Sequence, residues 1–321
     1  MSKIVICSDF HISSVNRIND IRDSMEQIYQ YCKNNNDVKF LFFLGDAYTK
    51  RNPRQKEMRI FENWAQRINE LNINQIYIIG NHDKDDETSA LGEFKELKVK
   101  DVKIVESGNT VKLGTLKIYL GHDLLREAKL GPLNYTVKKD ILTVAQLIYR
   151  HKDVDIFLLG HVHKFQILNN KPFVMYIGSI ERENFGERDE KKYFATLEIE
   201  TKKLSFHKLE IREMRQIECK SLKEIEIKDS DKKPIIKIVI KGTKEEVNKE
   251  LNQKDILQSL KNKCYDLTIQ TVIESQIRKR ETKISDVQGP VENLKDYCKE
   301  KNINEKVTLL GIKIIEKQLK R

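Results

Sequence analysis

Five apolar runs of the sequence each lead directly into side chains that can bind metal ions. A single D-x-H or G-H-x-H motif is more often a helix cap or a hydrogen-bonded turn. Five such runs in order are hard to explain by chance, and they favour a metal centre. In chain order, the polar residues that follow the runs are Asp9, His11, Asp46, Asn81, His82, Asp83, His122, His161 and His163.

This mixture of carboxylate, imidazole and amide groups predicts the chemistry of the centre. Such ligands suit manganese, iron or zinc, and one carboxylate can bridge two ions about 3.5–4 Å apart. A pair of ions held in this way makes water nucleophilic near neutral pH. Because most of the ligands are neutral, the centre would stay positively charged and would attract a phosphate group.

The elements that would carry these residues alternate between strand and helix. Residues 3–7, 38–45 and 73–80 are apolar and are typical of buried strands. Between them, apolar residues recur at helical spacing from Ile18 to Cys32, and Pro53 opens a second helix. This order predicts an α/β fold, in which ligands collect at the carboxyl ends of the strands.

The rest of the chain predicts a second sheet, a small α+β unit and a helical end. A hairpin around Gly114, a helix near residues 137–151 and several alternating segments indicate two sheets with helices outside. The sequence pattern changes near Arg212 to that of a small α+β unit. Two short helices are expected near residues 291–299 and 304–320. We therefore predict a core over residues 1–211, an α+β domain over 212–280, and a linker with C-terminal helices over 281–321.

Composition permits an anionic partner and suggests a reducing compartment. The net charge is +10, and residues 204–321 carry 27 Lys and Arg against 20 Asp and Glu. An AT-rich genome would give a similar excess of lysine, so the charge alone decides nothing. The five cysteines contain no C-x-x-C pair, which argues against a disulfide framework or a thiolate zinc site. No apolar run approaches the ~18 residues of a membrane span, so we expect a cytoplasmic protein without membrane association.

The motif series DFH, GD, GNHD, GH and GHVH resembles the calcineurin-like metallophosphoesterases over residues 3–210. The resemblance implies a two-sheet α/β sandwich core with two divalent ions. It implies that His82 contacts the scissile phosphate and protonates the leaving oxygen or stabilises the transition state, and that Asp83 orients His82. The implied ligands are Asp9, His11, Asp46 and His163 for the first ion, with Asp46 bridging, and Asn81, His122 and His161 for the second.

Two further stretches, "GDAYTKRNPRQ" (45–55) and "YIGSIERENFGERDEKKYF" (176–194), are similar to the DNA double-strand-break repair nucleases of the bacterial SbcD group. This similarity implies a manganese-dependent DNA exo- and endonuclease. It also implies a cap domain that helps to bind DNA and terminal helices that dock on an SMC-like ATPase of the SbcC type. A homodimer is compatible with it. Thr49 stands where family members carry His or Asp, which leaves the balance of exo- and endonuclease activity open.

The expected contacts with DNA and with the partner are less specific than the metal ligands. Basic residues that could contact phosphates are Lys50, Arg51, Arg54, Arg182 and Arg188. Apolar residues of the last helix that could contact the ATPase are Val307, Leu310, Ile314 and Leu319.

Two other functions stay open at this point. A small-molecule phosphodiesterase or protein phosphatase on the same core would not explain the cap, the basic C-terminal third or the two nuclease-like stretches. A non-catalytic scaffold should have lost ligands, and none is missing.

Overall fold

The computed structural model describes residues 2–13, 17–83, 102–130, 141–274 and 289–319. The chain divides into two compact units, residues 1–240 with 253–270, and residues 241–252 with 271–321. The domain boundaries expected at residues 211/212 and 280/281 stay predictions. Within the described residues, no helix combines the length and hydrophobicity that a membrane span requires.

A six-stranded sheet contains the N-terminal strand near its centre. Strands β1 to β4 run parallel to one another, and β10 pairs antiparallel with β1. The parallel order places the carboxyl ends of β1, β2 and β3 at the same edge. In spatial order the strands are β11 (Leu204–Lys208), β10 (Tyr193–Glu198), β1 (Lys3–Cys7), β2 (Val38–Phe43), β3 (Asn74–Ile78) and β4 (Val102–Val105).

A five-stranded sheet supplies the remaining strand ends. Its central strands β6, β7 and β9 are parallel, and β5 and β8 pair antiparallel at its two sides. The spatial order is β5 (Asn109–Leu113), β6 (Leu116–Gly121), β7 (Ile156–Leu159), β9 (Phe173–Tyr176) and β8 (Gln166–Asn170). The predicted hairpin around Gly114 is the β5–β6 pair.

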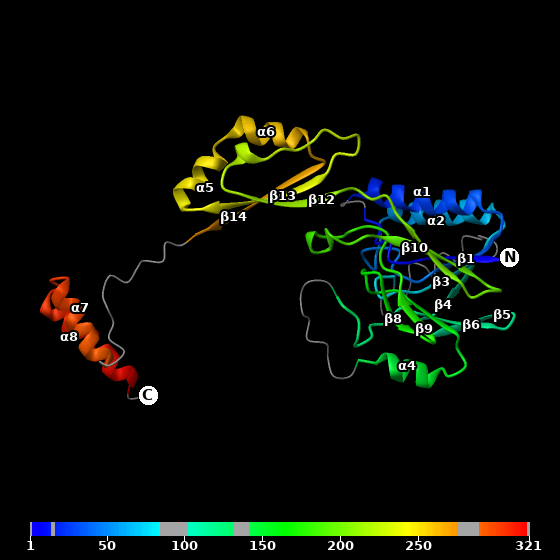
Figure 1. Cartoon of the computed structure of the whole chain (residues 1–321), viewed down its shortest axis with the longest axis horizontal. Coiled ribbons are helices and arrows are strands. Elements are labelled where there is room, and N and C mark those ends of the chain that lie inside the picture. Colours follow the sequence, from blue (N-terminus) through cyan, green and yellow to red (C-terminus); the bar gives the residue numbers. More distant parts are fainter. Residues whose placement is uncertain (1, 14–16, 84–101, 131–140, 275–288, 320–321) are drawn as a thin grey trace. The chain divides into compact units, whose positions relative to one another are not determined.

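The two sheets pack face to face between outer helices, which confirms the predicted two-sheet α/β sandwich (Figure 1). Side chains of a strand alternate between its faces. Ile4 and Ile6 therefore enter the apolar core between the sheets, while Val5 and Cys7 pack beneath α1 (Ile18–Asn34) and α2 (Gln55–Asn69). On the far side, α4 (Val144–Arg150) covers the five-stranded sheet.

Two helices begin later than the sequence pattern predicts, because capping groups fix their first turns. The helix expected from Pro53 begins at Gln55, and the Arg54 N–H donates to Glu57 Oε2 at 2.7 Å. In the described part of the segment 137–151, the helix begins at Val144. The Thr143 hydroxyl caps it by accepting from the Gln146 N–H at 3.1 Å. Residues 137–140 of that prediction lie outside the described residues.

The segment after Arg212 forms a third sheet with two helices, as the α+β pattern predicts. The sheet order is β12–β13–β14, and β12 and β13 are parallel. The elements are β12 (Met214–Cys219), β13 (Ile235–Gly242), α5 (Lys244–Leu251), α6 (Lys254–Asn262) and β14 (Asp266–Ile273).

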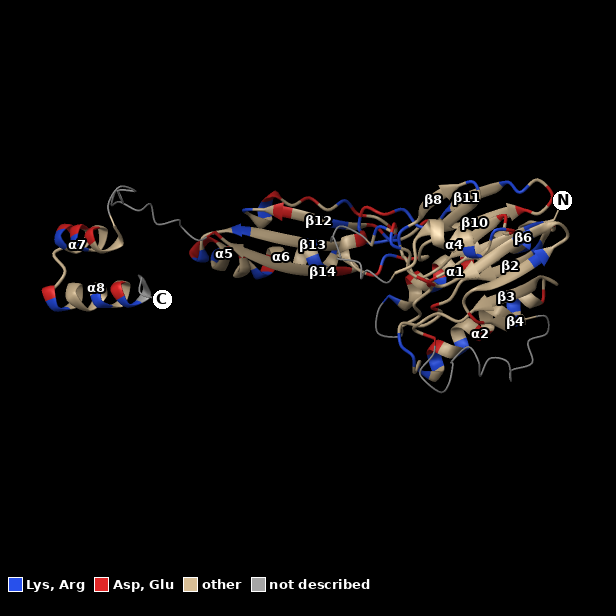
Figure 2. Cartoon of the chain, turned by 90° about the horizontal axis from the view of Figure 1, so that it is seen from below, with Lys and Arg blue, Asp and Glu red and all other residues tan. Residues whose placement is uncertain are grey.

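The chain ends in a helical hairpin of α7 (Pro290–Glu300) and α8 (Glu305–Leu319). A Cβ on Gly311 would stand 2.9 Å from Leu294 Cδ2, so the two helices approach closely there. Val307, Leu310 and Ile314 are each more than half exposed. Figure 2 shows that basic and acidic residues are interspersed along the ribbon of both helices.

Candidate metal centre

The nine predicted site residues come to one edge of the sandwich. Asp9 and His11 follow β1, Asp46 follows β2, and residues 81–83 follow β3 of the six-stranded sheet. His122 follows β6, and His161 and His163 follow β7 of the five-stranded sheet. Because these strands are parallel within each sheet, their carboxyl ends bring the loops together.

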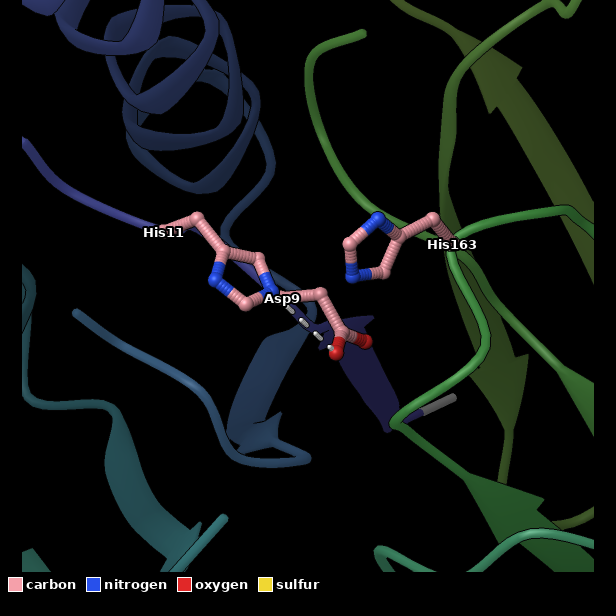
Figure 3. Close-up of side chains that lie close together, drawn as sticks. All are labelled: Asp9, His11 and His163. Carbon is pink, nitrogen blue, oxygen red and sulfur yellow. Dashed lines mark ion pairs between the residues drawn. The ribbon is translucent and has the colours of Figure 1, made fainter. Parts of the chain in front are cut away.

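The first ligand group contains Asp9, His11 and His163. One ligand atom from each lies within 4.8 Å of the others. Figure 3 shows Asp9 between the two imidazole rings, with a ring nitrogen of each histidine turned towards it. His11 Nε2 lies 3.9 Å from Asp9 Oδ1, a separation that leaves room for a cation between the two atoms.

The second ligand group contains Asp46, His122 and His161, with the same 4.8 Å limit between ligand atoms. Asp46 Oδ2 lies 3.1 Å from His122 Nε2 and 3.7 Å from His11 Nε2. Asp46 therefore faces both groups, as a bridging carboxylate must. Asn81 is adjacent, with its Oδ1 2.7 Å from His161 Nδ1.

The chemistry of these residues fits two divalent ions. Among the described residues, the buried Nε2 atoms of His11 and His122 make no hydrogen bond of acceptable geometry, although His122 Nε2 lies within ion-pair distance of Asp46. A buried polar atom without a partner is costly, and a metal ion would provide one for each. Oxygen and imidazole nitrogen donors with no thiolate suit a divalent cation that prefers mixed O and N ligands.

The surroundings of the site lower the pKa of one histidine ligand, His11, and raise that of another, His122. Burial and the charge of His163 lower the pKa of His11 to about 3, so His11 is neutral and able to act as a ligand. Burial opposes ionisation of both Asp46 and His122. Their mutual interaction outweighs that cost, so the pKa of Asp46 falls to about 2 and that of His122 rises to about 9. The site thus favours positive charge beside Asp46.

The backbone at the ligands is strained. Four of the predicted ligands have φ in the left-handed region: Asp9 (52°), His11 (47°), Asp46 (56°) and His161 (86°). Such conformations cluster at functional sites because surrounding contacts hold them. Here the His11 N–H donates to Asp46 O at 3.1 Å, and the His161 N–H donates to Asp9 Oδ1 at 3.1 Å.

Gly80 explains why the GNHD motif begins with glycine. A Cβ at this position would overlap both the backbone nitrogen and the Oδ1 of Asp46. Glycine lets the turn after β3 approach the turn after β2, and the His82 N–H then donates to Asp46 Oδ1 at 2.9 Å. The motif therefore positions Asp46 as well as its own side chains.

The role expected for Asp83, orienting His82, stays a prediction, and the structure gives the two side chains different partners. The His82 ring instead places Nδ1 2.9 Å from the carbonyl oxygen of Thr49. Asp83 is fully buried and accepts N–H bonds from Gly80, Asp46 and Ala47 at 2.8–3.0 Å. Asp83 therefore ties the turns after β2 and β3 together. Burial, with the charge of Asp46, raises its pKa to about 7.

Thr49 contacts His82 through its backbone carbonyl. The contact with His82 therefore does not depend on which side chain stands at position 49. The Thr49 hydroxyl donates to His11 O at 2.7 Å, and its N–H donates to Ile12 O at 3.3 Å. These two bonds fix the carbonyl that faces His82. A sequence pattern cannot show a partner of this kind because any residue type supplies a carbonyl.

The basic residues expected to contact DNA differ in availability. Lys50 and Arg51 are exposed on the loop after Asp46, and Arg54 is exposed at the start of α2. Arg182 is half-buried and donates to the carbonyls of Glu190 and Arg212, at 2.9 and 3.1 Å. Arg188 donates to Phe185 O at 3.1 Å. Lys50 and Arg51 are therefore the better candidates.

The residues expected to contact the ATPase lie far from the metal ligands in the sequence, on a separate helix. Val307, Leu310 and Ile314 lie on α8. Leu319 ends that helix, and its side chain lies outside the described residues.

Sequence reasoning missed three polar residues beside the first ligand group. Glu183 places Oε1 3.3 Å from His11 Nδ1, and Glu187 places Oε1 3.4 Å from His163 Nδ1. Lys192 is buried and pairs with Glu187 Oε2 at 2.6 Å. The signal was weak, since a run of alternating charges usually indicates an exposed segment.

Comparisons with known proteins agree with this geometry at the level of a family. The sequence model of the calcineurin-like phosphoesterase family matches residues 2–165, just over half of the chain. A search of curated protein sequences gives no match.

Three solved structures are similar to the chain at low identity. The protein TT1561 from Thermus thermophilus has 11% identity and a TM-score of 0.41, covering 64% of this chain and 98% of that one. A dimetal phosphatase from Danio rerio has 10% identity and a TM-score of 0.40, covering 64% and 95%. A cold-active protein-tyrosine phosphatase from a psychrophilic Shewanella has 13% identity and a TM-score of 0.37, covering 65% and 81%.

Proposed function

Because the chain belongs to the calcineurin-like phosphoesterase family, we propose that it is a manganese-dependent DNA nuclease, the SbcD-type subunit of a DNA repair and recombination complex. Family membership and the two ligand groups support the coarser conclusion, a metal-dependent phosphoester hydrolase. The observation that carries the proposal is the position of Asp46 between the two groups, with His82 on the adjoining turn.

The residues of the first and second groups would hold two divalent ions, which supply a nucleophilic water and stabilise charge on the phosphoryl oxygens when bound. Asp46 would face both ions, and Asp83 would keep the two turns that carry Asp46 and His82 in register. The cavity of about 140 Å³ that is lined by Asp9, His11 and Thr49 offers room beside the first group.

In this proposal, His82 moves a proton. Its Nδ1–H donates to the carbonyl of Thr49, so its Nε2 is the nitrogen available to a substrate. In the imidazolium form, Nε2 can donate a proton to the leaving oxygen, a step that is typically worth about 10²–10⁴-fold in rate. The ring of His82 lies edge-on to that of His11, with centroids 5.2 Å apart, which places it beside the first group.

The choice of DNA as substrate is supported by sequence and charge. The stretches at 45–55 and 176–194 are similar to the SbcD-type nucleases, and residues 204–321 hold most of the excess positive charge. Lys50 and Arg51 are exposed on the loop that begins at Asp46. Phosphate contacts of this kind bind DNA without reading its sequence, as a repair nuclease requires.

Manganese and the ATPase are the proposed cofactor and partner. Imidazole and carboxylate ligands without thiolate suit manganese. The exposed apolar residues of α8 offer a helical surface to an SMC-like ATPase of the SbcC type.

A substrate panel tests the proposal. Metal-free protein is loaded with Mn²⁺ and given duplex DNA ends, single-stranded DNA, bis-p-nitrophenyl phosphate and p-nitrophenyl phosphate. We expect cleavage of DNA and of the diester. The His82→Ser variant should lose about 10²–10⁴-fold in rate with unchanged Mn²⁺ binding. His151→Ser is the matched control, since His151 contacts Tyr119 outside both ligand groups. Hydrolysis of the monoester alone would overturn the nuclease proposal in favour of a phosphatase.

A further inference from the structure

Lys192 is a buried lysine whose ammonium contacts the metal-ligand loop. Its side chain is 1% exposed. Nζ donates to the His163 carbonyl at 3.0 Å and to Ser179 Oγ at 2.9 Å. It also pairs with Glu187 Oε2 at 2.6 Å and Glu190 Oε2 at 3.2 Å. Burying an ammonium is costly unless it is paired and hydrogen-bonded, so this arrangement calls for a role.

Glu187 extends the contact from the backbone of His163 to its ring. While Oε2 pairs with Lys192, Oε1 lies 3.4 Å from His163 Nδ1. Figure 3 shows a ring nitrogen of His163 turned towards Asp9. Since Nδ1 is the nitrogen beside Glu187, the nitrogen directed at Asp9 is Nε2. Lys192 thus reaches His163 twice, directly at its carbonyl and through Glu187 at its ring.

We propose that Lys192 and Glu187 form a clamp that positions His163, holding its Nε2 towards the first ligand group before any ion binds. A carboxylate on the far nitrogen of a ligating histidine fixes the orientation of the ring and increases its basicity as a ligand. The ammonium offsets the negative charge of Glu187 and anchors the loop that carries His163. Lys192 and Glu187 are positioning residues, since neither belongs to the ligand group of Asp9, His11 and His163.

The acidic residues around His163 do not form a separate cation site. His163, Glu183 and Glu187 have ligand atoms within 4.8 Å of one another. However, Lys192 already places a positive charge 2.6 Å from Glu187. A divalent ion there would have to displace the ammonium, so the clamp accounts better for this cluster.

The clamp rests only on the metal-binding part of the proposed function, and its test measures metal directly. Full-length metal-free protein is titrated with Mn²⁺ by isothermal calorimetry, and melting temperature is recorded for the same samples. The variants are Glu187→Gln and Lys192→Met, with Lys192→Arg as the conservative replacement. Lys202→Met is the matched control, because Lys202 is 44% exposed and pairs with Asp155 outside the site.

We expect Glu187→Gln to weaken one of the two Mn²⁺ affinities by about 10–100-fold and to leave the other unchanged. Lys192→Met should give the same selective loss, and Lys192→Arg should restore part of it. If Lys192→Met does not fold, Glu187→Gln decides the question, because it keeps the size and shape of the side chain.

The outcomes separate the two proposals. Wild-type Mn²⁺ affinities in Glu187→Gln would overturn the clamp, as would equal weakening of both ions with a lowered melting temperature, the mark of a merely structural role. A wild-type protein that binds no Mn²⁺ would overturn both the clamp and the proposed function. Selective weakening in a protein that fails to cut DNA would support the clamp and refute only the nuclease.

Discussion

At the scale of single residues, the close contact between Gly80 and Asp46 links two motifs that are far apart in the sequence. The turn after β3 approaches so near that a side chain at Gly80 has no room. At this short distance, the His82 N–H donates to the Asp46 carboxylate, and the Asp46 N–H donates to the Asp83 carboxylate. The position of the bridging carboxylate therefore depends on the neighbouring motif.

Gly80→Ala should disturb both stability and metal binding. The added methyl would overlap Asp46, and forcing an extra group into a packed site typically costs about 1–3 kcal/mol of unfolding free energy. We expect a matching loss in urea denaturation and weaker binding of both Mn²⁺ ions in calorimetry. Gly114→Ala is the control, because its Cβ would meet no atom within 4 Å. The left-handed φ of 63° at this position should cost the Gly114→Ala variant about 1–2 kcal/mol of unfolding free energy. We expect its Mn²⁺ binding to stay unchanged. Unchanged metal binding in Gly80→Ala would contradict the inferred link.

At the residue level, the sequence indicates side chains whose type can bind metal, and it does not indicate partners that depend on the surrounding fold. Asp, His and Asn at strand ends predicted the two ligand groups because those side chains bind metals wherever they converge. Lys192 could not be predicted, since lysine is almost never fully buried unless paired. The Thr49 carbonyl was also invisible, and it supplies the contact that was expected from Asp83.

At the scale of elements, a buried ion-pair network joins α1 to the segment before β12. Asp20 on α1 is fully buried. It accepts from Arg212 Nε at 2.9 Å and from Arg17 Nε at 2.9 Å. Arg212 also donates to Lys233 O at 2.6 Å, and its guanidinium lies 4.0 Å from the ring centre of Tyr265. One carboxylate therefore holds the N-terminal turn of α1 against the start of the third sheet.

The contribution of Asp20 to stability should depend on pH. Burial raises its pKa, but the hydrogen bond from Arg212 and the charge of Arg17 outweigh burial and hold the pKa below 3.8. A lowered pKa in the folded state means that the contribution is complete above about pH 4 and is lost as the pH falls further. Asp20→Asn should cost about 3–5 kcal/mol near neutral pH, because it leaves the Arg212 guanidinium without the carboxylate it pairs with, whereas Arg17 keeps Glu181 at 2.8 Å.

Urea denaturation of wild type and Asp20→Asn at several pH values measures this effect. We expect a constant difference in unfolding free energy from neutral pH down to about pH 5, and a narrowing gap below about pH 4. Asp37→Asn is the control, since Asp37 pairs with Lys3 at 2.8 Å but is 38% exposed, and should cost only about 0–1 kcal/mol. A gap that stays the same at low pH would rule out ionised Asp20 as its source.

Most elements could be predicted from periodicity, and the exceptions have physical causes. Strands β1, β2, β3, β7 and β10 are apolar runs or alternating segments, so their burial can be predicted from residue type and spacing. Strand β8 (Gln166–Asn170) was missed because "QILNN" is polar and largely unburied, and it is defined by pairing with β9 at the edge of the sheet. Edge strands of this kind depend on a partner that no local pattern contains.

At the scale of the whole molecule, the α7–α8 hairpin buries some of its apolar residues and leaves others exposed. Gly311 packs on Leu294, and Cys298 is buried within the hairpin unit. Val307, Leu310 and Ile314 are 57–61% exposed. Residues three and four positions apart share one side of a helix, so these three form a single exposed apolar face.

Negative charge placed on that face should abolish binding of the ATPase and leave the nuclease activity unchanged. The double variant Leu310→Glu, Ile314→Glu in the full chain should keep its Mn²⁺-dependent cleavage of DNA, because α8 carries no predicted ligand. We expect it to lose binding to an SMC-like ATPase from the same host, measured by co-purification, and to lose ATP-stimulated cleavage. Lys313→Glu is the matched control on an exposed position of the same helix. A lower melting temperature with unchanged ATPase binding would instead assign the face to intramolecular packing.

The left-handed backbone at Asp9, His11, Asp46 and His161 has a consequence for how such a chain could change over generations. Each of these residues holds a conformation that costs about 1 kcal/mol or more for a residue with a side chain. Glycine at the same positions would relieve that strain and also remove the ligands. A lineage freed from the need to bind metal would thus lose its reason to keep these four side chains in a strained conformation. In this chain all four positions carry side chains that can bind metal, which a working metal centre requires and a non-catalytic scaffold does not.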